Sequence, residues 1–469
     1  TTAPQTSGSG CQMDWNPTFP PTPKKYDPPV EISTIWNAGT KYLEGDSWNN
    51  NPLYNQCLEY TCIKFTQHYE ATGDVVQAKL AADFAAGTPP DMFYSSGSFL
   101  EQLIQDEAIE DIKSIWEATA SPLLKEKKEY PDRKWWRPID RNGKLFGIPF
   151  TWGPAYNIDN LCFIRKDFLD KSGIEMPTTL DDWAEMFRKW KTDGITKWGL
   201  AGSKNLVTWY YSLDPIFGAF GVMPTCWRPA GDGTLKYDSI SPAVKEALGL
   251  LRDWYAEGFL NPDFYTLGEG QDEPNIVNGN HGVYTAPWWV GGGHADWETK
   301  EYKDIGMQWT TMPYPKGPRG EQGRKESGAV QVSIWFKKGI DPIKAEAFIN
   351  NMNWHMEKHV NWEKYQQYGE WRNSHAFVEG YEWVWDDNCE LTYGPVSNSV
   401  GTYGYMNAID GGFPFGVYPA YQYDMFKDMK KWVEADPKTL NKAQRWLLSK
   451  AQVRKEMEYY SFVYETLNI

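Results

Sequence analysis

The sequence has no apolar run that approaches the ~20 residues of a membrane-spanning helix, although 41% of its 469 residues are hydrophobic. It also has no long basic segment, and its formal net charge is −15. This charge balance argues against nucleic acid and against an anionic membrane surface as partners, whereas a small anionic ligand would need only a local Arg or Lys. We therefore expect a soluble chain of about two or three domains that binds no nucleic acid.

Motifs that mark common active sites are missing as well. No GxSxG element, Walker A loop or GxGxxG follows an expected strand, and the glycines at 291–293 are not followed by Lys-Ser/Thr. HMEKH (355–359) places two histidines on one helix face, but its order is not HExxH and no third ligand can be named. DGITKWG (193–199) lacks the alternating Asp/Asn ligands of a calcium loop. We expect no catalytic residue, no cofactor and no metal site.

Cysteine is scarce, and its spacing fits neither a zinc ribbon nor a redox CxxC. The six residues are Cys11, Cys57, Cys62, Cys162, Cys226 and Cys389. Cys57 and Cys62 could pair if the helix between them ends sharply, but buried free thiols are the favoured state for most of the six. Residues 1–29, rich in Pro, Thr and Ser, are interpreted as a flexible tether.

Tryptophan is the residue that the sequence has in excess, with 25 copies, and aromatic residues make up 16% of the chain. Trp183, Trp190 and Trp254 lie in expected amphipathic helices, which favours core packing. A ligand contact is preferred for tryptophans at expected strand ends or in glycine-rich loops, because a pliable backbone can present a ring there. These are Trp36, Trp152, Trp288 and Trp289.

Two further interpretations stay open. Trp48, Trp209 and Trp371 fit a core or a ligand role equally well. Arg372, beside Trp371, could hydrogen-bond a hydroxyl or pair with a carboxylate.

Local periodicity predicts an α/β protein. The first series consists of strands at 30–36, 63–70 and 91–95 with helices at 51–62 and 74–87 between them. Strand, helix and strand in alternation predict a parallel sheet with right-handed crossovers.

The second series begins with a strand that runs into a helix at 161–174. Further helices are expected at 178–194, 241–258 and 341–357, and strands at 279–286 and 328–338. Two more helices are expected around 421–434 and 440–467. Asn50 or Asn51 should cap the helix at 51–62, and Thr179 the helix at 178–194.

The expected strands suggest where a ligand binds, since ligands of open α/β sheets bind beyond the carboxyl ends of strands. Trp36 and Asn37 end the first strand, and Trp288 and Trp289 follow the strand at 279–286. The third strand ends at Tyr94, Ser95 and Ser96.

Five stretches in the same order resemble the extracellular solute-binding proteins of sugar ABC transporters, family 1, in their large Gram-positive lipoprotein form. The resemblance covers most of residues 30–350. The stretches are DVVQAKLAADFAAGTPPDMFY (74–94), NGKLFGIPF (142–150), FIRKDFLDKSGIEMPTTLDDWAEMFRKW (163–190), SPAVKEALGLLRDWYAEGFLNPDF (241–264) and GNHGVYTAPWW (279–289).

The resemblance implies a two-lobed, type II periplasmic-binding-protein-like fold with an oligosaccharide held between the lobes. Lobe 1 would comprise 30–150 and 330–395, and lobe 2 would comprise 151–329 and 396–469. The hinge would lie near 151–158 and 326–334, with a third crossing near 395–420.

The resemblance also implies which residues bind the sugar. Lobe 1 would supply Trp36, Asn37, Trp48 and Tyr94 to Ser96, and lobe 2 would supply Trp209, Tyr284, Trp288 and Trp289. The calcium loop that some large members carry in the second lobe is missing from this sequence.

The partners implied are an oligosaccharide and the membrane permease subunits of an ABC importer. We expect a monomer outside the cell, attached to its surface by a lipid anchor upstream of or near the N-terminus. The aromatic composition suits a secreted glycoside hydrolase too, and a binding protein for peptides or another nutrient is a third possibility. Ligand closure of two lobes would require no covalent chemistry.

Overall fold

The structure of the chain is a computed structural model. It describes residues 24–37, 42–71, 74–95, 98–129, 136–151, 160–207, 210–268, 271–287, 306–325, 330–360, 383–385, 391–393, 431–432, 434–440, 445 and 448. No helix in these ranges is long and apolar enough to cross a membrane.

The chain divides into two compact units. Unit 1 is Thr1–Pro154 with Gly328–Ser461, and unit 2 is Ala155–Ser327 with Phe462–Ile469. The lobes expected from the sequence change at 151, 330 and 396, whereas the units change at 155, 328 and 462. The extent of each lobe stays a prediction, because most of the residues after 393 lie outside the described ranges.

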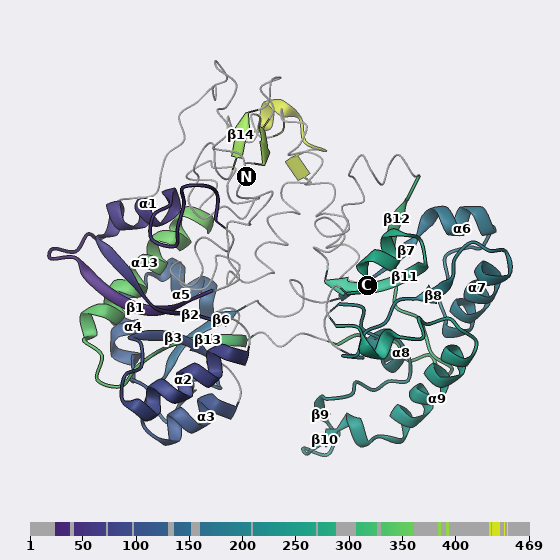
Figure 1. The fold of residues 1–469 in the computed structure, drawn as a ribbon, viewed down its shortest axis with the longest axis horizontal. Helices are drawn as coiled ribbons and strands as arrows, with labels where there is room; N and C mark the ends of the chain where they lie inside the picture. Colours follow the sequence, from purple (N-terminus) through teal and green to yellow (C-terminus); the bar gives the residue numbers. More distant parts are fainter. Residues whose placement is uncertain are drawn as a thin grey trace. The chain divides into compact units, whose positions relative to one another are not determined.

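Unit 1 contains the first expected series, and the strands and helices of that series lie at the positions that local periodicity predicts (Figure 1). Its strands are β1 (Val30–Asn37), β2 (Ile63–Ala71), β3 (Met92–Ser95), β4 (Asp140–Arg141), β5 (Lys144–Leu145), β6 (Gly147–Thr151), β13 (Val330–Phe336), β14 (Trp383–Trp385) and β15 (Leu391–Tyr393). Its helices are α1 (Pro52–Thr61), α2 (Asp74–Ala86), α3 (Ser98–Gln105), α4 (Lys113–Thr119), α5 (Pro122–Glu129) and α13 (Pro342–Val360), with a 3₁₀ turn η5 (Pro437–Thr439).

The strand pairing of unit 1 differs from the expected all-parallel sheet. Strands β1 and β2 are parallel, as predicted, with a register shift between Thr34 and Ile35. Strand β3, however, pairs antiparallel with β13, and β13 pairs antiparallel with β6. The prediction was wrong because periodicity marks a strand but not its neighbour, and β13 comes from a part of the chain far from β3.

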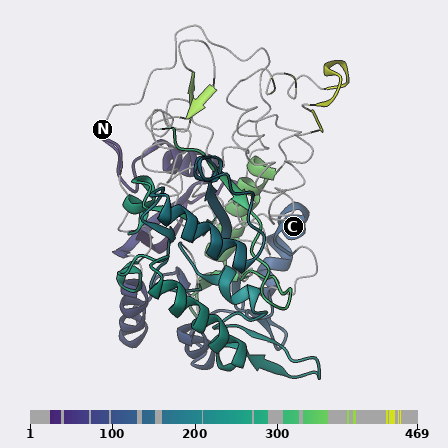
Figure 2. The ribbon, with the colours of Figure 1, turned by 90° about the vertical axis from the view of Figure 1, so that its right-hand side faces the viewer.

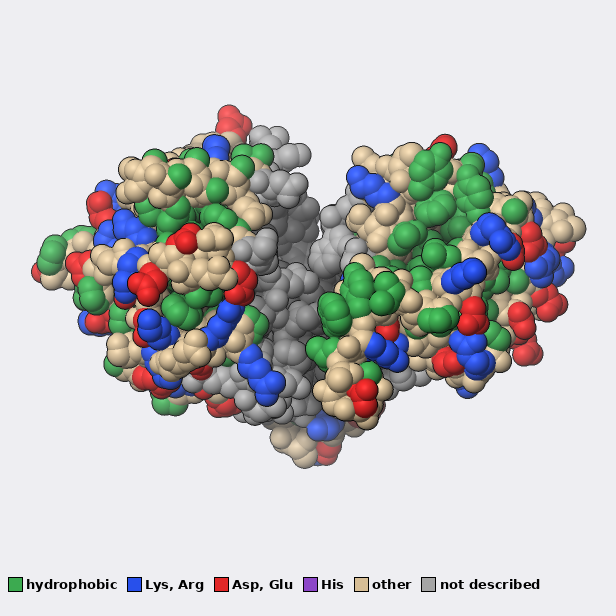
Figure 3. Space-filling model, turned by 90° about the horizontal axis from the view of Figure 1, so that it is seen from below, with side chains coloured by type: hydrophobic (Ala, Val, Ile, Leu, Met, Phe, Trp, Pro, Cys, Tyr) green, Lys and Arg blue, Asp and Glu red, His purple; other side chains and the backbone are tan. Residues whose placement is uncertain are grey.

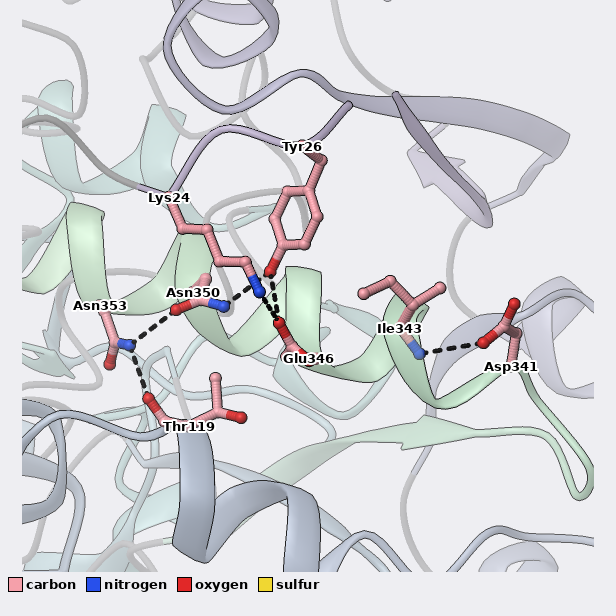
Figure 4. Close-up of polar contacts among 8 residues, drawn as sticks. All are labelled: Lys24, Tyr26, Thr119, Asp341, Ile343, Glu346, Asn350 and Asn353. Atoms are coloured by element: carbon pink, nitrogen blue, oxygen red, sulfur yellow. Dashed lines mark hydrogen bonds and ion pairs between the residues drawn. The ribbon is translucent and has the colours of Figure 1, made fainter. Parts of the chain in front are cut away.

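Helix α13 holds several parts of unit 1 together. Buried side chains follow its length at helical spacing: Ala345, Phe348, Ile349 and Met352. On another face, Tyr26 donates to Glu346 at 3.2 Å and accepts from Asn350 at 2.6 Å (Figure 4). Asn353 donates to the carbonyl of Thr119 at 2.9 Å, so the end of α4 is fastened to the same helix.

A buried carboxylate connects four elements of unit 1. Oδ2 of Asp91, just before β3, accepts from the amide of Ser33 on β1 at 3.0 Å and from Nζ of Lys344 on α13 at 2.6 Å. Its Oδ1 lies 2.9 Å from Nζ of Lys337, which directly follows β13. Burial alone would raise the pKa of Asp91, but hydrogen bonds from Lys344, Ser33 and Lys337 outweigh it and lower the pKa to about 2.

Unit 2 contains most of the second series. Its strands are β7 (Asn160–Arg165), β8 (Trp198–Leu200), β9 (Trp227–Pro229), β10 (Leu235–Tyr237), β11 (His281–Pro287) and β12 (Trp309–Met312). Its helices are α6 (Lys166–Ser172), α7 (Leu180–Thr192), α8 (Asp214–Ala219), α9 (Pro242–Ala256) and α10 (Glu273–Val277), with 3₁₀ turns η2 (Asp238–Ile240) and η3 (Phe264–Thr266). The main sheet has the order β12-β7-β11-β8, in which only β11 and β8 are parallel.

Helices α7 and α9 pack together against the sheet of unit 2 (Figures 1 and 2). The tryptophans predicted to be core residues are buried, and the rings of Trp183 and Trp254 stack at 6.5 Å. Trp190 approaches β11 so closely that a Cβ on Gly282 would lie 2.1 Å from its ring. The strand therefore requires glycine at this position.

Both predicted helix starts are confirmed. Oδ1 of Asn51 accepts from the amide of Tyr54 at 2.9 Å at the start of α1. At the start of α7, Thr179 and Asp182 exchange side-chain-to-backbone hydrogen bonds of 3.1 and 2.9 Å, which is a complete capping box.

Charges of both signs are interspersed over the described surface of each unit in the face seen in Figure 3. Exposed charges of unit 2 form pairs, such as Arg188 with Glu257 at 2.7 Å and Arg319 with Glu246 at 2.8 Å. Exposed pairs of this kind contribute little to stability, since solvent screens them.

The Asp91 contacts generate a stability prediction. Asp91→Asn removes the charge that faces two lysines, and we expect a loss of about 2–4 kcal/mol in the free energy of unfolding at pH 7. Because the folded-state pKa is lowered from 3.8 to about 2, the stabilisation is present above pH 3.8 and is lost as pH falls toward about 2. Urea unfolding from pH 7 to pH 2 measures the difference between wild type and variant, which should shrink in that window.

The matched control is Asp106→Asn, because Asp106 is exposed and accepts a side-chain hydrogen bond from Gln102 four residues away. Its urea midpoint should stay near that of the wild type. Equal midpoints for Asp91→Asn and Asp106→Asn at pH 7 would show that the buried carboxylate is not a major contributor.

Candidate functional site

In unit 1, aromatic side chains gather at the carboxyl end of β1. The rings of Trp36 and Trp48 lie 5.1 Å apart, and those of Trp48 and Tyr54 lie 6.2 Å apart. Nε1 of Trp36 donates to the hydroxyl of Tyr42 at 2.8 Å. Trp48 is half-buried, whereas Trp36 is 0% exposed.

This burial is that of a core residue, and the ligand role of Trp36 stays a prediction. Its ring is enclosed by the hydrophobic core of unit 1, and its only polar atom already has a partner. A strand-end position therefore did not place the ring in solvent, because residues 42–54 of the chain cover it.

The end of β3 lies beside the end of β1. Tyr94 is half-buried, and its hydroxyl donates to the carbonyl of Ile35 at 3.3 Å. Asn37 and Ser95 are the last residues of β1 and β3, although the structure does not describe their side chains. The ends of the two strands that carry these predicted residues thus lie side by side, and the ligand roles of the residues stay predictions.

In unit 2, Tyr284 belongs to a buried aromatic cluster. Its ring lies 4.9 Å from Phe163, 6.0 Å from Tyr211 and 4.9 Å from Trp309, and the residue is 0% exposed. Tyr284 therefore packs among these rings in this structure, and its ligand role stays a prediction. It lies in the middle of β11, where it pairs with Phe163 of β7.

A buried polar network near the start of β7 was not predicted from the sequence. Nδ2 of Asn160 donates to Oγ of Ser212 at 2.9 Å, and Ser212 donates in turn to Asp214. The amide of Lys325 donates to the other oxygen of Asp214 at 3.2 Å. Burial raises the pKa of Asp214, although hydrogen bonds from Ser212 and the Lys325 amide act against it.

No sequence motif marks this network, since its members come from separate parts of the chain. The one local signal is Asp214 at the start of the sequence DPIFGA, because Asp commonly precedes Pro where a short helix begins.

Seven predicted ligand residues lie outside the described residues, and their roles stay predictions. Strand β6 ends just before Trp152, and β11 ends just before Trp288 and Trp289. The full set is Ser96, Trp152, Trp209, Trp288, Trp289, Trp371 and Arg372.

The described cysteines are all free thiols: Cys57, Cys62, Cys162 and Cys226. The possible Cys57–Cys62 pair is therefore not formed. Burial raises the pKa of the Cys162 thiol well above its usual range, which keeps it protonated and unreactive. Within the described residues no group of three or more His, Cys, Asp or Glu side chains could hold a metal ion.

Two α/β units, each with its own sheet and core, are the architecture that the family resemblance implies. Residues 53–353, well over half of the chain, match the family described as bacterial extracellular solute-binding protein. The chain belongs to this family.

Two curated relatives from Bacillus subtilis (strain 168) are similar to the chain. The polygalacturonan/rhamnogalacturonan-binding protein YtcQ is 28% identical over 227 residues, which cover 45% of this chain and 41% of the relative. The lipoprotein LipO is 28% identical over 237 residues, which cover 45% of this chain and 44% of the relative. The matched part is thus less than half the length of each relative.

Among solved structures, the alginate-binding protein AlgQ2 without calcium ion is similar to the chain with a TM-score of 0.60. The match covers 94% of this chain and 96% of that one at 15% identity. At this identity the likeness shows the shared fold and nothing finer.

The burial of Trp36 generates a prediction that separates a core role from a ligand role. Trp36→Ala should lower the free energy of unfolding by about 3–5 kcal/mol, because it leaves a cavity and removes the partner of Tyr42. Trp227→Ala is the control, since Trp227 is 64% exposed and should tolerate truncation. Chemical denaturation followed by circular dichroism measures both. A Trp36→Ala variant as stable as wild type would contradict the core role of Trp36.

Proposed function

We propose that this protein is the extracellular substrate-binding component of an ABC importer, that it captures an oligosaccharide at the strand ends of its two units, and that it delivers the sugar to a membrane permease. The observation that carries the proposal is the family match over residues 53–353. Each unit's fold supports it, since β1 and β3 converge in unit 1 and a buried polar network adjoins the sheet of unit 2.

The chemistry of sugars suits the predicted site. Pyranose rings have apolar C–H faces that pack on aromatic rings, and hydroxyl edges that require hydrogen-bond partners. Trp48 and Tyr94 are half-buried at the strand ends of unit 1 and fit the first requirement. Trp288 and Trp289, directly after β11, are proposed to do the same in unit 2. Several aromatic rings favour an oligosaccharide over a single sugar.

The finer parts of the proposal concern partners and location. The protein would act as a monomer outside the cell, held to the surface by a lipid anchor, in keeping with a relative that is named a lipoprotein. Binding would shift the population of the two units toward a closed arrangement that the permease recognises. Nucleic acid has no part in this function.

Catalysis has no part in the proposal either, and the competing function is a secreted carbohydrate-active enzyme. Composition alone fits both, because a tryptophan-rich site also suits a glycoside hydrolase. A binding protein leaves its ligand intact, whereas a hydrolase produces new reducing ends. Product analysis therefore separates the two functions directly.

Titration with a panel of oligosaccharides tests the function. The panel should contain galacturonan oligosaccharides, because one relative is named for binding polygalacturonan and rhamnogalacturonan, and neutral plant and host oligosaccharides beside them. We expect a saturable change in tryptophan fluorescence with one class of glycan at micromolar concentration, with no shorter products by chromatography. Shortened glycans would favour the enzyme, and a peptide response without a glycan response would favour another nutrient.

Substitution of the tryptophans after β11 tests the site. The double variant Trp288→Ala/Trp289→Ala should weaken binding of the identified glycan at least ~30-fold, since each lost stacking partner removes about 1–3 kcal/mol of contact free energy. Trp227→Ala, which truncates an exposed tryptophan on β9, should bind as the wild type does. Calorimetric titration measures both. An affinity within twofold of wild type in the double variant would remove this segment from the site.

A further inference from the structure

Two bulky residues of one unit 2 segment have left-handed backbone conformations. Leu206 has φ +54° and Tyr211 has φ +56°, a region that residues other than glycine rarely adopt. Such conformations persist only where the surrounding structure enforces them, and they are often found at binding sites. Leu206 bonds within its own segment, to Ser203 and Leu213, whereas Tyr211 is held by a contact from another part of the chain.

The holding contacts are made by the end of β11. The amide of Tyr211 donates to the carbonyl of Thr285 at 2.7 Å, and the hydroxyl of Thr285 donates to the carbonyl of Ser212. The two hydroxyl oxygens of Ser212 and Thr285 lie 3.4 Å apart. Both residues are 0% exposed, so these bonds do not compete with water.

The sheet explains why β11 needs these side chains. Strand β8 pairs with β11 at His281 and Val283, and β8 ends at Leu200. The amide of Ala201 still bonds to Val283 at 2.9 Å, after which the chain leaves the sheet and returns at Tyr211 to bond Thr285. Tyr211 thus supplies to β11 the next hydrogen bond beyond the end of β8, although it does not belong to a strand.

The contact between Tyr211, Ser212 and Thr285 lies close in sequence to two proposed ligand residues. Trp209 precedes Tyr211 by two residues, and Trp288 follows Thr285 by three. Both tryptophans are proposed ligand residues from distant parts of the chain. The contacts between Tyr211, Ser212 and Thr285 therefore lie just after Trp209 and just before Trp288 in the sequence.

We propose that Thr285 and Ser212 are positioning residues for ligand binding, because they hold the chain just after Trp209 against the end of β11, just before Trp288. They need not touch the ligand themselves. Ser212 is itself held by further hydrogen bonds, because it also accepts from Asn160 at 2.9 Å and donates to Asp214. This inference rests on the proposed function of an oligosaccharide-binding protein.

The test is the isosteric substitution Thr285→Val, which removes the hydroxyl and keeps the volume. We expect affinity for the glycan that the wild type binds to fall at least tenfold, and the amide of Tyr211 to exchange faster with deuterium. Thr285→Ser keeps the hydroxyl and should restore affinity to within twofold. These three proteins are compared at a temperature well below their melting points.

The matched control is Thr196→Val. Thr196 is also buried in unit 2, and its hydroxyl lies 2.9 and 3.0 Å from the carbonyls of Trp198 and Gly279, near the start of β11 rather than its end. It should lower stability to a similar degree while leaving affinity and Tyr211 exchange unchanged. A merely structural role for Thr285 would make the two variants behave alike.

The outcomes separate this inference from the proposed function. A wild type that binds no glycan of the panel overturns the proposed function and the ligand role of Thr285 with it. A wild type that binds, with Thr285→Val binding equally well, overturns the positioning role alone. If Thr285→Val does not fold, Ser212→Ala takes its place, with the same expected direction and the same reversal if its affinity is unchanged.

Discussion

Each unit of this protein depends on a buried carboxylate that gathers hydrogen-bond donors from distant parts of the chain. Asp91 joins β1, α13 and the end of β13 in unit 1, and Asp214 joins Ser212 to the Lys325 amide in unit 2. The pKa of Asp91 is lowered because two lysines face it, whereas the pKa of Asp214 is raised by burial. The negative charge of Asp91 thus stabilises unit 1 through the two lysines, whereas Asp214 holds Ser212 and the Lys325 amide chiefly through hydrogen bonds.

The tryptophans fall into two groups with different physical roles. Those on amphipathic helices, such as Trp183 and Trp254, stack on one another and fill the core of unit 2. Trp36 joins the core of unit 1 although it ends a strand, and its neighbour Trp48 remains half-buried. Most of these large flat rings therefore belong to the cores of the two units. The proposed sugar contacts fall to rings outside the cores, such as the half-buried Trp48.

The family and the architecture together favour a binding function. Ligand recognition by such a protein requires rings and polar groups that are held in place before the ligand arrives, because ordering them on binding would reduce affinity. The junction of Tyr211 with Thr285 supplies that order in unit 2, at the expense of a left-handed backbone. In unit 1, the hydrogen bond by which Asn51 caps α1 fixes the backbone three residues after Trp48.

The sequence by itself determined strands β1 to β3, helices α1, α2, α7 and α9, the caps at Asn51 and Thr179, and the core tryptophans of α7 and α9, because each follows from side chains a few residues apart. It also carried the family resemblance, which the match over residues 53–353 confirmed. Only the tertiary structure decided that β13 inserts between β3 and β6, that Trp36 and Tyr284 are enclosed, and that Ser212 meets Thr285. These features depend on contacts between residues far apart in the chain, and local periodicity carries no information about which distant segment covers a given face.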